Sequence, residues 1–180
     1  MTRAQQQQYR VLRQDGIAPA YAKQLATAKP LPDALDGWLG DAPTTWHVGP
    51  FTLRAECHAE EAPDLSWLGA FSDRWQPGAI DRVAAGVANR GERRYFVPSQ
   101  CRGTHAEQRA DWRRLEDYGR GWEMVTVAVS VTYRGAEVAS LAYGNIESDS
   151  GRYLAETAAD LAAEALLDAR RWVASVRGAA

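Results

Sequence analysis

The stretch that most constrains the fold is residues 122–176, whose hydrophobic pattern begins with one period and ends with another. Valine takes every second position from Val125 to Val131, and smaller or more polar residues lie between. Successive side chains of a strand point to opposite faces, so the valines share one face of a half-buried strand. Arg134-Gly135 interrupts this alternation, and Gly tolerates the positive φ of a tight hairpin turn. Residues 122–143 therefore predict a β-hairpin, which we expect to end at Gly144-Asn145.

From Tyr153 onward the period changes to about 3.6 residues, which is typical of an amphipathic helix. Apolar side chains fall near one face, and acidic side chains recur every four residues on another. Ser148, Asp149 and Ser150 precede this run, and their oxygens suit the free N–H groups of a first helical turn. The sequence predicts a long helix over residues 151–176. Its apolar face would contain Leu154, Leu161, Ala165, Trp172 and Val176.

Further segments complete the predicted fold. Residues 46–58 alternate as a second half-buried strand, and residues 93–98 end in a proline, which suits a short edge strand. Thr104 and Glu107 form a capping-box pattern at the start of a helix over residues 104–118. Residues 1–30 contain two short helical segments separated by Gly16.

These elements together predict an α+β fold. We expect a single domain over residues 1–180, in which an antiparallel sheet is packed by the C-terminal helix. The sheet would contain the strand at 46–58 and the hairpin at 122–143. An N-terminal helical hairpin over residues 1–30 would dock loosely against this core.

Composition restricts the class of protein. With 46% hydrophobic and 24% charged residues, the chain is typical of a globular protein and can bury a real core. No run of 18 apolar residues is present, so we expect no membrane contact, and the N-terminus lacks the apolar segment of a secretory signal. Two cysteines do not make a disulfide framework, so a cytoplasmic location is expected.

Two Cys–His pairs are candidates for a metal site or a nucleophile. Cys57 is followed by His58, and Cys101 precedes His105 by four positions. Structural zinc uses such ligands, but the paired Cys-x2-Cys spacing is absent. Cys57 is also expected on the apolar face of its strand and His58 on the other. We therefore expect a buried structural cysteine, with no bound metal and no cofactor.

Glu147 and Asp149 are the candidate acidic pair. Two carboxylates with neighbouring serines could bind a cation or act as acid and base, but two are too few for a convincing all-protein cation site. Helix capping explains Asp149 and the two serines without a ligand, and it is the favoured interpretation.

Charge is divided unevenly along the chain. The segment from Glu147 to Asp168 is strongly acidic, and the segment from Arg90 to Arg120 is basic. Charged helix faces are usually only solvated, but an acidic face can occupy a surface that binds nucleic-acid phosphates, and a basic patch can bind the phosphates themselves. The candidate acidic binding residues are Glu147, Asp149, Glu156, Asp160 and Glu164. The candidate nucleic-acid-binding residues are Arg93, Arg94, Arg109, Arg113 and Arg114.

The N-terminal segment offers little for DNA binding. Two helices joined at a glycine could form a helix-turn-helix, whose recognition helix is normally basic. Here the second segment carries only Lys23 and Lys29, so a docked helical hairpin is the favoured interpretation.

Several short motifs over residues 50–170 resemble a group of small proteins encoded by phages, prophages and other mobile elements. The most specific motif combines Glu147-Ser148-Asp149-Ser150 with Tyr153-Leu154. In this chain Tyr143-Gly144-Asn145-Ile146 precedes it, which is an insertion relative to the group's pattern. The other motifs are Asp64-x-Ser66-Trp67-Leu68-Gly69, Pro77-Gly78-Ala79-Ile80-Asp81, Arg94-Tyr95-Phe96-x-Pro98 and Asp111-x3-Leu115-Glu116-Asp117-Tyr118-x2-Gly121-Trp122.

The resemblance implies a function class but transfers no catalytic residue. Proteins of this size and gene context are often non-enzymatic inhibitors of host defence, anti-CRISPR proteins among them. The first hypothesis is therefore a mobile-element protein that binds and inhibits a host defence complex by protein–protein contact, with an acidic helix face that blocks a nucleic-acid site. A nucleic-acid-binding accessory protein that uses the arginine-rich region is the second. The third is a small metal-dependent enzyme that uses Glu147 and Asp149 or the Cys–His set.

Overall fold

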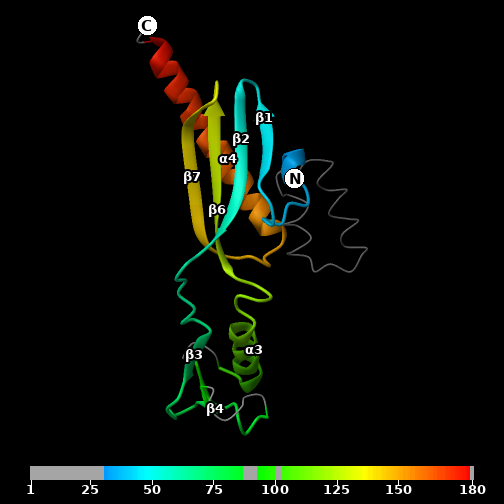
Figure 1. The fold of residues 1–180 in the computed structure, drawn as a ribbon, viewed down its shortest axis with the longest axis vertical. Helices are drawn as coiled ribbons and strands as arrows, with labels where there is room; N and C mark the ends of the chain where they lie inside the picture. Colours follow the sequence, from blue (N-terminus) through cyan, green and yellow to red (C-terminus); the bar gives the residue numbers. More distant parts are fainter. Residues whose placement is uncertain (1–30, 87–92, 100–102, 179–180) are drawn as a thin grey trace.

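The computed structural model describes residues 31–86, 93–99 and 103–178, which form two lobes along one long axis (Figure 1). The large lobe is a four-stranded antiparallel sheet in the order β1-β2-β6-β7, with helix α4 across one face. The small lobe is a three-stranded sheet in the order β3-β5-β4, with helix α3 beside it. The prediction of an α+β fold with antiparallel pairing and a long C-terminal helix is confirmed.

The predicted central hairpin is present as β6 (Met124–Tyr133) and β7 (Ala136–Glu147). Arg134 and Gly135 make the turn with φ of 52° and 83°, the left-handed pair that a two-residue hairpin loop requires. The expected end at Gly144-Asn145 is wrong, because β7 continues to Glu147. The extra residue is absorbed as a β-bulge, in which Asn145 has a φ of 58° and its N–H donates to the Glu60 carboxylate.

The predicted strand at residues 46–58 is in fact two strands. β1 (Thr44–Val48) and β2 (Phe51–Ala59) pair as a hairpin around Gly49-Pro50, with Val48 opposite Phe51. The apolar positions change from even (Trp46, Val48) to odd (Phe51, Leu53) at this turn, and this change of phase separates the two strands. A 3-10 turn, η1 (Asp33–Leu35), precedes β1 and buries Leu35.

Helix α4 (Arg152–Gly178) covers the valine face of the sheet. Its contact side is built largely from alanines, which lets the helix lie close to the strands. Leu154 is fully buried, whereas Trp172 and Val176 are about half exposed, because the helix extends beyond the end of the sheet (Figure 1). The buried alanines are Ala155, Ala158, Ala162, Ala165 and Ala169.

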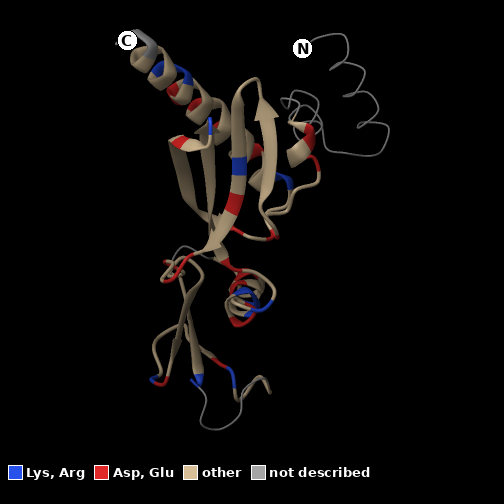
Figure 2. Cartoon of the chain, turned by 45° about the horizontal axis from the view of Figure 1, so that its top comes forward, with Lys and Arg blue, Asp and Glu red and all other residues tan. Residues whose placement is uncertain are grey.

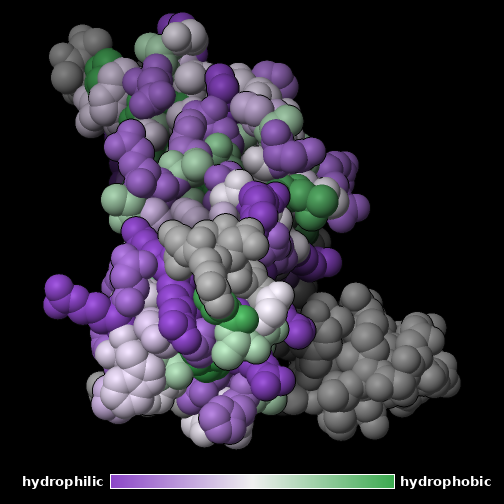
Figure 3. Space-filling model, turned by 60° about the horizontal axis from the view of Figure 1, so that its bottom comes forward, coloured by the Kyte–Doolittle hydropathy of each residue, from purple (hydrophilic) through white to green (hydrophobic). Residues whose placement is uncertain are grey.

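The small lobe contains β3 (Gly69–Ser72), β4 (Ile80–Asp81), β5 (Tyr95–Pro98) and α3 (His105–Glu116). The predicted edge strand at 93–98 is wrong in position: β5 is the central strand, with its proline as the last residue. Helix α3 begins with the expected capping box between Thr104 and Glu107. Seen from this end, the surface is mostly hydrophilic, with small separate hydrophobic patches (Figure 3).

The predicted N-terminal helical hairpin, residues 1–30, lies outside the described residues. Within the described part of the chain, none of the helices has the length and apolar character needed to cross a membrane.

Candidate functional site

A groove of about 300 Å³ lies between strand β7 and the N-terminal half of α4. It is open to solvent. Its lining combines carboxylates, two phenol rings, a leucine and a threonine. We call it the acidic groove. Its residues are Tyr143, Tyr153, Glu156, Thr157, Asp160, Leu161 and Glu164.

The fold explains why these residues meet. Glu156, Asp160 and Glu164 recur every four positions, so they lie along one side of α4. Tyr143 pairs with Val127, so its side chain lies on the helix-covered face of the sheet, at the outermost strand. Tyr143 and Tyr153 remain 54% and 50% exposed, so both rings are available to a partner.

The groove keeps a net negative charge. Glu156 accepts a hydrogen bond from Arg152 Nε at 2.9 Å, and further along the helix Asp168 accepts one from Arg171 at 3.1 Å. No ion pair within the described residues engages Glu164. In Figure 2 the visible part of α4 carries acidic residues, with basic residues nearer its C-terminal end. The predicted binding residues Glu156, Asp160 and Glu164 are therefore brought together in one concave surface.

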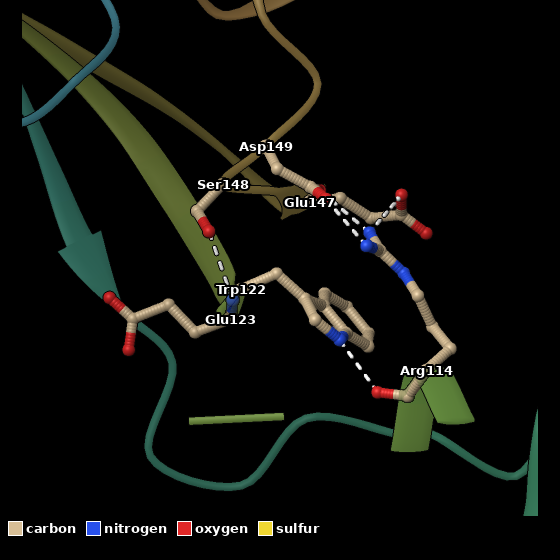
Figure 4. A network of polar contacts seen from close by, with 6 residues as sticks. All are labelled: Arg114, Trp122, Glu123, Glu147, Ser148 and Asp149. Carbon is tan, nitrogen blue, oxygen red and sulfur yellow. Dashed lines mark hydrogen bonds and ion pairs between the residues drawn. The ribbon is translucent and has the colours of Figure 1, made fainter. Parts of the chain in front are cut away.

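The other two predicted acidic residues, Glu147 and Asp149, lie elsewhere and face the small lobe (Figure 4). Arg114 of α3 donates from Nη1 and Nη2 to the two oxygens of Asp149 at 2.5 and 2.6 Å, and from Nη2 to Glu147 at 2.8 Å. Its guanidinium lies 3.9 Å from the ring centre of Trp122, and Trp122 Nε1 donates to the Arg114 carbonyl at 2.7 Å. We call this group the interlobe clamp.

Electrostatics of the clamp follow from these contacts. The hydrogen bond from Arg114, together with its positive charge, holds the pKa of Asp149 below its ordinary value. The same hydrogen bond raises the pKa of Arg114. A carboxylate that is already bound by a guanidinium in two places is a poor cation ligand or general base, because both of its oxygens are occupied.

The capping prediction for Ser148, Asp149 and Ser150 is wrong, and the buried Ser150 Oγ has no hydrogen-bond partner within the described residues. The Ser148 hydroxyl accepts from the Glu123 N–H at 2.9 Å, and the Ser148 N–H donates to the Glu123 carbonyl at 2.8 Å. Asp149 binds Arg114 instead of the helix start. The sequence pattern of a cap was present, but Ser148 is bound by Glu123, the residue before β6, and Asp149 by Arg114 of α3.

The predicted arginine-rich surface is divided. Arg114 belongs to the clamp, and Arg94 donates to Asp81 from Nε at 3.0 Å and from Nη2 at 2.5 Å. Arg109 and Arg113 are exposed on α3, and Arg93 is exposed before β5. Two of the five candidate phosphate ligands are therefore engaged within the chain.

The Cys–His set is only partly described. Cys57 is a free, half-buried thiol, and burial raises its pKa to about 11. His58 lies on the opposite face of β2 and approaches Glu56 at 3.3 Å. Cys101 lies outside the described residues, within which no group of three or more His, Cys, Asp and Glu side chains could hold a metal ion.

Sequence reasoning missed the two tyrosines of the groove. Tyr143 was expected at the end of a strand and Tyr153 at the start of a helix, with no reason to join them. Their proximity depends on the bulge in β7 and on the way α4 crosses the sheet, and the alternation in β7 alone could only have placed Tyr143 on the helix-covered face.

Comparisons with protein-family models, with curated proteins and with solved structures found no match to this chain.

Proposed function

We propose that this protein is a non-enzymatic binding protein that recognises a basic surface of a partner protein through the acidic groove. The observation that carries this proposal is the concave grouping of Glu156, Asp160 and Glu164 with the half-exposed rings of Tyr143 and Tyr153.

The chemistry of the groove suits a cationic partner. Tyrosine supplies large contact area with little loss of side-chain freedom, and its ring face attracts Arg and Lys. Each such contact contributes about 0.5–2 kcal/mol, depending on how far it is shielded from water. Carboxylates at the same place add charge complementarity, which raises the association rate and excludes acidic partners.

The resemblance to mobile-element proteins narrows the proposal. A row of carboxylates along a helix is one way to occupy a surface that otherwise binds nucleic-acid phosphates. We propose a host defence complex as the partner, with its nucleic-acid-binding surface blocked by α4. The groove supports the acidic contact, and the identity of the partner rests on the resemblance.

A capture experiment with matched charge reversals tests this function. The tagged protein and the triple variant Glu156→Lys/Asp160→Lys/Glu164→Lys are incubated with host lysate, with and without nuclease, and retained proteins are identified by mass spectrometry. The control triple variant reverses three exposed acids outside the groove, Asp36→Lys/Glu61→Lys/Asp73→Lys, and so carries the same net charge. We expect a stoichiometric complex that survives nuclease, is lost with the groove variant and is kept with the control.

Other outcomes point to other functions. Equal capture by both triple variants would reject the acidic groove. Recovery of nucleic acid alone, lost on nuclease treatment, would favour the exposed arginines of α3. Metal found by elemental analysis of the purified protein would favour a metal-dependent enzyme.

A further inference from the structure

Strand β7 forms an open edge of the large sheet. Within the described residues it pairs with β6 and with no other strand. From Ala136 to Tyr143 it contains one charged side chain, Glu137, and no proline or lysine. The N–H and C=O groups on its outer side are thus a template for another strand.

This edge carries less protection than natural sheets usually have. Exposed edges are commonly shortened, charged, interrupted by proline or by β-bulges, or covered, and β7 has only its bulges and Glu137. The opposite edge fits that rule, because β1 has only five residues and ends at Gly49-Pro50. In β7 two bulges interrupt the pairing with β6, one at Val138 and one beyond Tyr143, and the stretch from Ala139 to Tyr143 between them keeps a regular register.

The open edge and the acidic groove adjoin each other. Tyr143 belongs to both, since it ends the regular part of β7 and lines the groove. Side chains of a strand alternate between the two faces of its sheet. A strand added along β7 would therefore direct every second side chain to the face that carries α4, beside Glu156, Asp160 and Glu164.

We propose that β7 binds an extended basic segment of the partner as a fifth strand, whose cationic side chains enter the acidic groove. This inference rests on the proposed function and specifies the form of the ligand. Backbone hydrogen bonds would supply affinity, and the charge of alternate side chains would supply specificity. A second copy of this chain is the less suitable occupant, because antiparallel pairing of two β7 edges would bring two acidic grooves together.

Peptides with blocked backbones test the strand addition. The probe is a peptide of alternating Arg and Thr, as long as the regular stretch from Ala139 to Tyr143, and two further versions are N-methylated at the odd or at the even positions. In an added strand, alternate amides face β7. We expect one methylated version to bind roughly tenfold more weakly or worse, and the other to bind like the parent peptide. Isothermal titration calorimetry gives the affinities.

Hydrogen exchange supplies a second readout on the protein itself. Binding of the parent peptide should slow exchange of amides in β7 between Ala139 and Tyr143, while amides of β1 keep their rates. The milder triple variant Glu156→Gln/Asp160→Gln/Glu164→Gln removes charge without reversing it. It should bind the parent peptide more weakly than the natural chain does, and the hydrogen-exchange pattern of the free protein should stay unchanged.

The outcomes separate this inference from the function on which it rests. Equal affinity of both methylated peptides, with binding still lost in the charge-reversed groove variant, would overturn strand addition and leave the groove intact. Strand addition would also be overturned, and the groove kept, if the parent peptide failed to bind while capture of the partner still depended on the groove. A doubled mass in light scattering, with protection of β7 in the absence of peptide, would assign the edge to a second copy.

Discussion

At the scale of single residues, Gly40 shows how closely the loop before β1 approaches the core. It has a φ of 80°, and a Cβ there would lie 2.6 Å from the sulfur of Cys57 and 3.6 Å from Leu154 Cδ1. Gly37 has a similar φ of 73° but open space around it. A substitution at Gly37 therefore tests the strain of the positive φ alone, whereas one at Gly40 adds a steric clash.

We predict that Gly40→Ala lowers the free energy of unfolding by about 2 kcal/mol or more, and Gly37→Ala by about 1 kcal/mol. The larger loss reflects the displacement of Cys57 in addition to the strained φ. Urea denaturation of both variants measures the difference. Equal losses would show that the loop moves away from β2 at little cost.

At the scale of elements, α4 depends on small side chains where it crosses the sheet. Ala165 is fully buried against the strands, whereas Ala163 lies on the exposed side two positions away. Close packing of this kind has no room for added methylene groups.

We predict that Ala165→Leu destabilises the protein by about 1–3 kcal/mol, because the longer side chain must push the helix from the sheet. Ala163→Leu should change stability by less than about 0.5 kcal/mol. Denaturation midpoints of the two variants test the contrast, and a tolerated Ala165→Leu would mean that helix and sheet are separated by more free space than their burial indicates.

The elements also show which parts of the fold the sequence could predict. β6, β7 and α4 carry long periodic patterns with local turn signals, so their positions followed from spacing and turn residues, except for the end of β7, where the bulge carries the strand on to Glu147. β3 and β4 are four and two residues long and hold no readable period, so the central position of β5 was missed. The carboxylates of the groove were predicted because they lie on one helix, while Tyr143 and the clamp partner Arg114 come from segments distant in sequence.

At the scale of the whole molecule, the interlobe clamp fixes the small lobe against the large one. The guanidinium of Arg114 is held by two carboxylates and covers buried Trp122. The carboxylates are 37% and 43% exposed, so water screens part of the attraction.

We predict that Arg114→Ala broadens the distance distribution between spin labels on the two lobes, placed at Arg74→Cys and Thr45→Cys in a background without native cysteines. Unfolding free energy should fall by about 1–2 kcal/mol after the discount for solvent. Arg113→Ala, one residue earlier on α3 and exposed, is the control and should change neither quantity. Unchanged distances in Arg114→Ala would show that the lobes are held by their shared apolar contacts.

The clamp should also depend on pH in a defined direction. Because the folded-state pKa of Asp149 is lowered, its contribution is present above the ordinary aspartate value of about 3.9 and is lost as pH falls through the folded-state pKa. The stability difference between the natural chain and Asp149→Asn should therefore shrink below about pH 4.

The position of the small lobe in the chain has a kinetic consequence. Residues 60–123 are inserted between β2 and β6, which are neighbours in the large sheet and pair from Ala59 opposite Val125. The β6–β7 pair closes a two-residue loop, whereas β2 can join β6 only after the whole insertion is looped out, at a cost that grows with the logarithm of its length. A small lobe that folds early shortens the effective length of that loop. Its early folding would therefore speed the pairing of β2 with β6, and the insertion would assist the folding of the sheet from which it projects.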